Sequence, residues 1–246
     1  MSSGSMDLYD LALWDHYRGN GPVSVVVHRD DGLREDLPMT PFFESPVDSD
    51  TPRARLEQAA LALCRGRVLD IGAGAGRHSL ILQERGLNVC AIDIAAHAVD
   101  IMRRRGVREA HRADIWQYSG GPYDTLLMLM HGIGIVGTLA GLDRFLRHAR
   151  GLTNPGGRIV LDSLDVRHTD DPVHIAYQEA NRRMGRYEGE IRMRFEYGGQ
   201  IGEFIEWLHI DYDTLSEHAA AAGWACRRVY ALDNGDYLAE LTRLDT

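Results

Sequence analysis

A glycine-rich segment around residue 72 constrains the fold of this 246-residue chain more than any other feature. Val68–Ile71 reads as the end of a buried strand, and Gly72, Gly74 and Gly76 follow at alternate positions. A helical pattern then starts near Arg77. Glycines let a backbone turn tightly and approach a ligand, and the free N–H groups of a helix start favour negative charge. The segment predicts a strand–turn–helix unit that binds a ligand.

The spacing of the glycines discriminates between ligands. The dinucleotide fingerprint G-x-G-x-x-G requires a glycine at position 77, where this chain has arginine. The chain instead reads D-x-G-x-G-x-G, with Asp70 two residues before the first glycine. A nicotinamide oxidoreductase is therefore disfavoured.

Short apolar strands alternate with amphipathic helices from residue 67 onward, which is typical of a doubly wound α/β sheet. A helix over 212–222 and two further strands follow the fifth strand. The helix between the fourth and fifth strands carries a stripe of Leu142, Phe145, Leu146 and Ala149. The expected strands are 67–71, 88–93, 109–113, 124–130, 158–163, 225–231 and 236–243.

Two segments lie outside this pattern. Residues 6–52 are expected to form an N-terminal cap, with a hairpin around Asp30-Asp31-Gly32. Residues 164–210 are expected to be an insertion on the substrate side. It should hold a helix over 172–184 and a hairpin of strands 190–197 and 201–210. The remaining chain, 53–246 including the insertion, is predicted to be one ligand-binding domain.

The D-x-G-x-G-x-G turn, the acid Asp93 that ends the second strand and the strand pattern together resemble class I S-adenosylmethionine (SAM) methyltransferases. The resemblance covers roughly residues 53–244. It implies a mostly parallel, seven-stranded, Rossmann-like sheet whose last strand runs antiparallel, with the cap and the helix/β-hairpin insertion added. It also implies SAM as cofactor and S-adenosylhomocysteine as product.

An acid in the position of Asp93 can accept hydrogen bonds from both ribose hydroxyls, although it can also cap the next helix. By resemblance, Asp114 accepts the adenine amino group and Ile115 packs on the ring, against the alternative that Asp114 is an ordinary loop aspartate. Asp70 is expected to act indirectly, by organising the turn and the methionine amino group. The full set expected to contact the cofactor is Asp70, Gly72, Ala73, Gly74, Gly76, Asp93, Ile94, Asp114, Ile115 and Met130.

Methyl transfer is a displacement, so the protein chiefly aligns the acceptor, and a general base helps if the acceptor starts protonated. In the fold that the chain resembles, the carboxyl end of the fourth strand faces the methyl group, and His131 stands there. His131 is the leading candidate base or orienting residue, against the alternative of a strand-end histidine bonded to backbone. Tyr17, with Trp14 and His16, is the second candidate, against a role in packing. Asp162, Asp165 and His168 have residue types that bind divalent metals, but ordinary turn residues fit them better, and no metal is predicted.

Composition and charge limit the classes of partner that the chain is expected to bind. A net charge of −9 argues against broad binding to nucleic acid, as does the absence of the Asn/Asp-Pro-Pro-Tyr/Phe pattern of nucleic-acid amino methyltransferases. The sequence shows no secretory pattern, no membrane-spanning run and no paired cysteine motif, which predicts a cytoplasmic protein. The expected acceptor is a small molecule, with specialised metabolism as its expected setting. A peptide or protein methyltransferase and a catalytically inactive SAM-binding regulator are the alternatives. The acceptor atom and the oligomeric state stay open.

Overall fold

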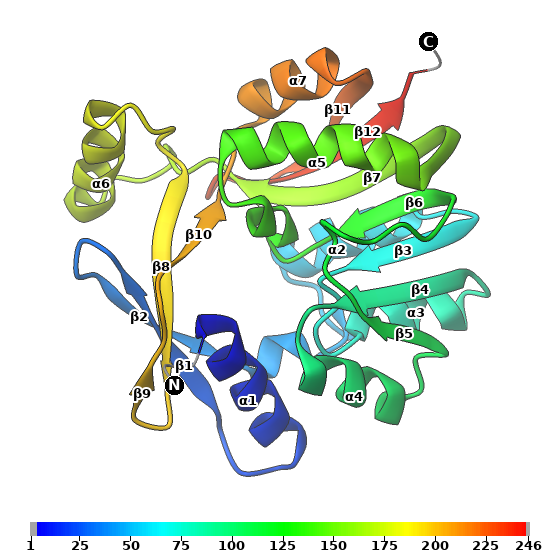
Figure 1. Ribbon diagram of the computed structural model, residues 1–246, viewed down its shortest axis with the longest axis horizontal. Helices are drawn as coiled ribbons and strands as arrows, with labels where there is room; N and C mark the ends of the chain where they lie inside the picture. The colour runs from blue at the N-terminus through cyan, green and yellow to red at the C-terminus, as the bar shows by residue number, and fades with distance from the viewer. Residues whose placement is uncertain (1–3, 245–246) are drawn as a thin grey trace. The chain divides into compact units, whose positions relative to one another are not determined.

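The computed structural model describes residues 4–244 and contains two β-sheets (Figure 1). The larger sheet has seven strands in the order β11-β12-β7-β6-β3-β4-β5. It is mostly parallel, with β4 parallel to β5 and β6 parallel to β7, while β12 runs antiparallel to β7. The predicted doubly wound sheet with an antiparallel last strand is confirmed. Its strands are β3 (Arg67–Ile71), β4 (Asn88–Asp93), β5 (Glu109–Arg112), β6 (Tyr123–Met128), β7 (Thr153–Leu164), β11 (Trp224–Ala231) and β12 (Asp236–Arg243).

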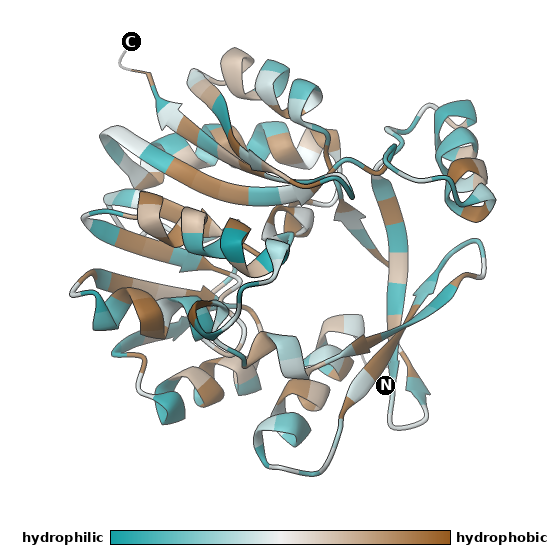
Figure 2. Cartoon of the chain, turned by 180° about the vertical axis from the view of Figure 1, so that it is seen from behind, coloured by the Kyte–Doolittle hydropathy of each residue, from teal (hydrophilic) through white to brown (hydrophobic). Residues whose placement is uncertain are grey.

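The smaller sheet joins the two predicted additions. Its order is β10-β8-β1-β2, with β9 paired to β8. The cap hairpin pairs in register, and β1 then pairs antiparallel with β8, so that Val27 lies opposite Phe195. Apolar residues concentrate in the strands of the large sheet, whereas β2 and β8 of the small sheet carry many polar residues (Figure 2). The strands are β1 (Ser24–Arg29), β2 (Arg34–Pro38), β8 (Glu190–Tyr197), β9 (Gln200–Ile201) and β10 (Ile205–Leu208).

The chain divides into two compact units, and the division crosses β3 after Leu69. Unit 1 holds the chain through Ser45, Asp70–Ile115 and Arg192–Ile205. Unit 2 holds Pro46–Leu69, Trp116–Ile191 and the chain from Glu206. The predicted division into a cap of 6–52 and a domain of 53–246 has different boundaries from these two units and stays a prediction. Residues 245 and 246 lie outside the described residues.

Unit 1 is organised around the helix α1 (Ser5–Tyr17), with α3 (Arg77–Glu84) and α4 (Ala96–Arg105) beside β4 and β5. Leu8, Ala12 and Leu13 of α1 share one apolar cluster with Val25 of β1 and Ile101 of α4. The cluster also includes Ala75 of the glycine turn. The cap helix and the small sheet therefore share a core with the predicted ligand-binding turn.

Unit 2 packs α5 (Leu139–Leu152) and α7 (Tyr212–Ala221) against β7, β11 and β12 (Figure 1). The predicted apolar stripe of α5 is fully buried, and Trp224 donates its indole N–H to the carbonyl of Leu146 at 3.1 Å. The helix α2 (Pro52–Leu63) also contacts β7, β11 and β12. The remaining helix of this unit, α6 (Pro172–Arg183), lies in the predicted insertion. Short 3-10 helices occupy Thr40–Phe42, Pro46–Asp48 and Gly132–Val136.

Two sequence predictions require correction. The predicted strand 201–210 is divided into β9 and β10. Between them Gly202 lies so close to Ser5 of α1 that an added Cβ would come within 2.5 Å of its Oγ. The predicted fifth strand, 158–163, is longer in the structure: β7 begins at Thr153, and its pairing with β6 jumps from Thr153 to Arg158 across a bulge.

No helix among residues 4–244 has both the length and the apolar character needed to cross a membrane.

Candidate active site

The glycine turn of unit 1 has the conformation that its sequence predicts. Gly72, Gly74 and Gly76 all have positive φ values, of 68°, 54° and 75°. A Cβ built on Gly72 or Gly74 would meet no atom within 4 Å, whereas one on Gly76 would lie 2.9 Å from side-chain carbons of Met102 and Val107. The first two glycines thus leave space for close approach by a ligand, and the third permits close packing of the turn on α4. These residues fit a nucleoside cofactor of the kind that the turn predicts.

Asp93 ends β4 and is bound to the same turn. Its Oδ2 accepts a hydrogen bond from the Gly74 N–H at 2.9 Å, and its Oδ1 accepts one from the Ala95 N–H at 2.9 Å. Burial raises the pKa of Asp93 to about 6, against the opposing effect of these two hydrogen bonds and with the help of the negative charges of Asp10 and Asp70. The carboxylate is therefore held next to the turn by two backbone N–H groups.

The other predicted cofactor residues of unit 1 divide into exposed and buried groups. Ile94 is 50% exposed directly after Asp93, which leaves an apolar surface available to a ligand ring, while Ala73 and Ile115 are buried. Asp114 follows β5 and is half-buried. Asp70 is buried and accepts a hydrogen bond from the Ser79 hydroxyl at 2.6 Å, so that it connects β3 to α3.

The aromatic residues of α1 make packing contacts within unit 1. Trp14 stacks on His97 with ring centroids 5.1 Å apart, and Tyr17 stacks on Phe43 at 6.5 Å. His16 also contacts the ring of Phe43. These contacts support the packing interpretation of Trp14 and His16. A catalytic role for Tyr17 stays a prediction.

His131 belongs to a partly buried polar cluster in unit 2. Its Nε2 lies 2.7 Å from Oδ1 of Asp236, at the start of β12, and 3.3 Å from Nη1 of Arg53 in α2. Arg53 also pairs with Asp162 of β7, and its Nη1 lies 3.6 Å from Asp236. The ring of His209 contacts that of His131 edge to face at 5.2 Å. We call Arg53, His131, Asp162, His209 and Asp236 the histidine cluster.

Electrostatics define the charge states in the histidine cluster. Burial opposes ionisation of Asp236, but the hydrogen bond and charge of His131, the charge of Arg53 and a hydrogen bond from Asn234 hold its pKa below the usual range. Burial is also the main cause that lowers the pKa of His209 to about 3, and the neighbouring His131 adds to the effect. The cluster therefore places an ionised carboxylate and a neutral imidazole on either side of His131.

The backbone that carries His131 has an uncommon conformation. Met130 and His131 both have φ = 58°, and no other non-glycine residue of 4–244 has a positive φ. Such residues cost of order 1–3 kcal/mol each and persist only where the surroundings impose them. Here Oδ1 of Asp162 accepts the His131 N–H at 3.0 Å. Strand β6 ends at Met128, so this turn carries both predicted residues, Met130 and His131, beyond the carboxyl end of the strand.

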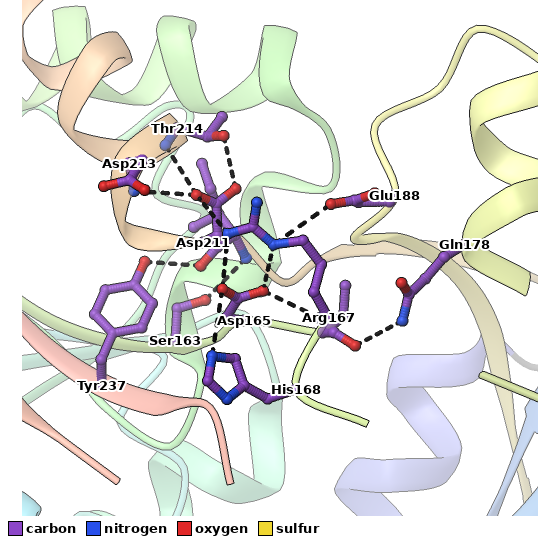
Figure 3. Close-up of polar contacts among 12 residues, drawn as sticks. Ser163, Asp165, Arg167, His168, Gln178, Glu188, Asp211, Asp213, Thr214 and Tyr237 are labelled. Carbon is purple, nitrogen blue, oxygen red and sulfur yellow. Dashed lines mark hydrogen bonds and ion pairs between the residues drawn. The ribbon is translucent and has the colours of Figure 1, made fainter. Parts of the chain in front are cut away.

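The structure does not bring Asp162, Asp165 and His168 together as a metal site. Asp162 pairs with Arg53, whereas Asp165 accepts two hydrogen bonds from Arg167, at 2.8 and 2.7 Å (Figure 3). Arg167 also pairs with Asp211, whose carboxylate caps α7, and His168 lies 3.9 Å from Asp165. Within 4–244, the only three such residues close enough to share an ion are Cys90, Glu109 and His111 of unit 1.

Three residues of the histidine cluster were not predicted from the sequence. Arg53, His209 and Asp236 lie far from His131 along the chain, and each has an ordinary local role as a helix-start, strand-end or turn residue. Pairing of β12 with β7 places Asp236 opposite Leu164, two residues beyond Asp162. A sequence signal was present only for Asp162, which ends the predicted fifth strand.

Comparison with known proteins identifies the class to which this fold and glycine turn belong. A methyltransferase-domain family model matches residues 47–229, and the chain belongs to this family. It is similar over its whole length to a SAM-dependent methyltransferase from Bacteroides fragilis, whose structure contains S-adenosyl-L-homocysteine. The identity is 32%, the TM-score is 0.83, and the match covers 99% of this chain and 97% of that one. The protein is a SAM-dependent methyltransferase that uses S-adenosylmethionine as cofactor.

More distant structures share the fold alone. The CcbJ methyltransferase of Streptomyces caelestis is 18% identical with a TM-score of 0.58, and the match covers 82% of this chain and 94% of that one. A SAM-dependent methyltransferase of Methanosarcina mazei is 16% identical with a TM-score of 0.59, over 73% of this chain and 93% of that one. No curated protein matches the chain.

Proposed function

We propose that this methyltransferase acts on a small molecule and that His131 removes the proton which the acceptor loses. The observation that carries the proposal is the hydrogen bond between His131 and Asp236, beyond the carboxyl end of β6. Ligands of doubly wound sheets bind at the carboxyl ends of the strands, and the glycine turn follows the carboxyl end of β3. An imidazole paired with a carboxylate is a common general base near neutral pH.

The cofactor supplies a methyl group on a sulfonium, and its transfer leaves the carbon–sulfur electron pair on the neutral thioether. The protein's residues have two roles in the proposed reaction. Gly72 and Gly74 admit the cofactor beside the backbone, and Asp93 accepts hydrogen bonds from its ribose. His131 accepts the acceptor's proton as the new bond to carbon forms, and Asp236 stabilises the resulting imidazolium.

The remaining proposed cofactor contacts follow from residue type and exposure. Ile94 and Ile115 provide apolar surface for the adenine, and Asp114 accepts its amino group. Ala73 and Gly76 shape the turn, Asp70 supports it through α3, and Met130 precedes the proposed base. Tyr17 stays a second candidate for contact with the acceptor.

A small acceptor is supported by charge. The net charge of −9 disfavours a polyanionic substrate, for which a cationic surface is required. We propose a cytoplasmic location, because Cys64, Cys90 and Cys226 are reduced thiols, as is usual in a reducing compartment. Specialised metabolism is proposed as the setting of the small-molecule acceptor.

The test is a methyl-transfer screen with S-adenosylmethionine carrying a labelled methyl group. Panels of small alcohols, phenols, amines and thiols are compared with a peptide panel, and products are detected by mass spectrometry. We expect labelled products from the small-molecule panel. His131→Ala should lower kcat about 10²- to 10⁴-fold, the range typical of general-base catalysis. His168→Ala removes an exposed histidine and is the matched control.

Binding of S-adenosylhomocysteine checks that each variant is folded. At 100 times its dissociation constant the ligand should add about 2.7 kcal/mol to stability, a rise in Tm of roughly 5–10 °C for a chain of this size. Products from the peptide panel alone would overturn the small-molecule proposal. Full activity of His131→Ala would remove His131 as the base.

A further inference from the structure

We propose that Asp236 is a positioning residue that holds the proton of His131 on Nε2 and thereby presents the Nδ1 lone pair as the proton acceptor. The proposal rests on the function of His131 proposed above and specifies which ring atom performs it. In the proposed step the acceptor's proton forms a bond to Nδ1, and the imidazolium keeps its other proton on Nε2, against Asp236.

The first step of the argument is the direction of the hydrogen bond. Oδ1 of Asp236 lies 2.7 Å from Nε2, and the side chain of Asp236 is 10% exposed. An ionised carboxylate has no proton to donate and can only accept. Nη1 of Arg53, which can only donate, lies 3.3 Å from the same Nε2 and would favour a lone pair there. The contact with Asp236 is the shorter of the two, at 2.7 Å, and a lone pair on Nε2 would point at its ionised oxygen. The neutral ring therefore carries its proton on Nε2.

Three further hydrogen bonds fix the orientation of Asp236. Asn234 donates from Nδ2 to Oδ2 of Asp236 at 3.0 Å, and the backbone N–H of Asp236 donates to the Asn234 side-chain oxygen at 3.1 Å. Gly235, between them, accepts a hydrogen bond at its carbonyl from the Asp165 N–H at 3.0 Å. The turn that carries the carboxylate is thus itself held at the end of β7.

Every element packed against His131 in unit 2 contributes a charged or titratable group. These groups are Arg53 of α2, Asp162 of β7, Asp236 of β12 and His209 after β10. Arg53 forms ion pairs with both carboxylates, so Asp162 and Asp236 share one cation. Asp162 binds the backbone N–H of His131, and Asp236 binds its ring. The backbone and the ring of His131 are therefore each held by a different carboxylate.

His209 does not compete for the Asp236 hydrogen bond. Its Nδ1 is buried without a hydrogen-bond partner, and its ring stands edge to face with that of His131. Because its pKa lies near 3, His209 stays neutral over the range in which proteins work. The contact with Asp236 is therefore left to His131.

The tautomer can be measured without knowing the acceptor. Protein with ¹⁵N-labelled histidine is studied by long-range ¹H–¹⁵N correlation at pH about 9, above the usual histidine titration. His131→Gln assigns the signals. We expect His131 to show a protonated Nε2 and an unprotonated Nδ1.

Asp236→Asn is the decisive variant. Asn234 Nδ2 should hold the new amide oxygen where Oδ2 now lies, which turns the amide N–H₂ toward His131. A donor in that position requires the lone pair on Nε2, so the tautomer should reverse. Asp233→Asn changes an exposed acid of the same turn and should leave the wild-type pattern intact.

The outcomes separate the two proposals. A wild-type His131 with its proton on Nδ1, or an unchanged tautomer in Asp236→Asn, overturns the positioning role. Retained stabilisation by S-adenosylhomocysteine shows that the variant is folded. If Asp236→Asn does not fold, the wild-type tautomer alone decides the proposal. With an acceptor from the screen, a drop in kcat with KM unchanged is expected for Asp236→Asn, whereas failure of the screen would leave the tautomer result standing.

Discussion

At the scale of single residues, Asp93 combines a half-buried position with a proposed contact to the cofactor. If a ribose hydroxyl donates to its ionised carboxylate, as proposed, cofactor binding favours the charged form of Asp93 and lowers its pKa. With a free-protein pKa of about 6, a rising share of Asp93 is protonated as the pH falls through 6. The affinity for S-adenosylhomocysteine should therefore be full at pH 8 and about tenfold weaker at pH 5.

Calorimetric titration in two buffers of different ionisation enthalpy checks this prediction. Near pH 6 binding should release protons, because the complex holds Asp93 ionised. Asp93→Asn should abolish the release and weaken binding, whereas Asp100→Asn, at an exposed acid of α4, should change neither. Equal affinity at pH 5 and pH 8 would contradict the assigned role of Asp93.

The glycines of the turn provide a second residue-scale prediction. Gly76→Ala forces a side chain into a left-handed conformation and against Met102 and Val107, which together should cost about 2–4 kcal/mol. Gly74→Ala meets no protein atom and should cost only about 1–2 kcal/mol, but it should lose affinity for S-adenosylhomocysteine. Denaturant unfolding and a ligand titration of both variants measure the contrast. An equal loss in the free energy of unfolding for Gly76→Ala and Gly74→Ala would show that the packing of Gly76 on α4 adds nothing to its cost.

At the scale of elements, the helix α1 supplies the cap that α4 lacks. The N-cap residue of α4 is Ala95, which has no side-chain acceptor. The two oxygens of Asp10 in α1 instead accept from the N–H groups of His97 and Ala98, at 3.0 and 2.9 Å. Asp10→Ala should lower the free energy of unfolding by about 1–2 kcal/mol, the usual effect of losing a cap.

Urea unfolding of Asp10→Ala tests this contact between helices. Asp100→Ala removes an exposed acid from α4 itself and is the control, because it leaves the capped N–H groups untouched. A Cm equal to that of the wild type in Asp10→Ala would mean that solvent caps α4 equally well.

Arg53 connects α2 to β7 and β12 through the two carboxylates of the histidine cluster. Asp162 is fully buried and Asp236 is nearly so. Removing the guanidinium of Arg53 would deprive both carboxylates of the cation with which they pair. Breaking a buried ion pair in this way costs about 3–5 kcal/mol, so Arg53→Met should be strongly destabilising.

Thermal unfolding of Arg53→Met is best compared with that of Arg55→Met, two residues away in the same helix. Arg55 pairs with Asp50 at 2.7 Å, but both side chains are exposed and solvent screens the pair. The midpoint of Arg55→Met should stay close to that of the wild type. Similar losses in both variants would show that burial does not distinguish these ion pairs.

At the scale of the whole molecule, the sequence predicted what depends on neighbours along the chain. Gly72, Gly74 and Gly76 require positive φ through local backbone sterics, and the α5 stripe follows from helical periodicity. Most strands of the large sheet were located to within a residue or two, because buried parallel strands are short apolar runs between turn residues. The cofactor class followed from the resemblance of the D-x-G-x-G-x-G turn and its flanking strands to class I SAM methyltransferases.

The tertiary structure decided which distant residues meet. The cap hairpin and the inserted strands, read separately from the sequence, form one sheet because β1 pairs with β8 across some 170 positions of chain. The cluster of Arg53, His131 and Asp236 joins residues from three parts of the chain by long-range hydrogen bonds and ion pairs. Periodicity and turn chemistry act over a few residues and carry no information about such pairings. The sequence alone therefore determined the strand–turn–helix unit and the cofactor, whereas the partner of His131 was decided by the packing of α2, β7 and β12.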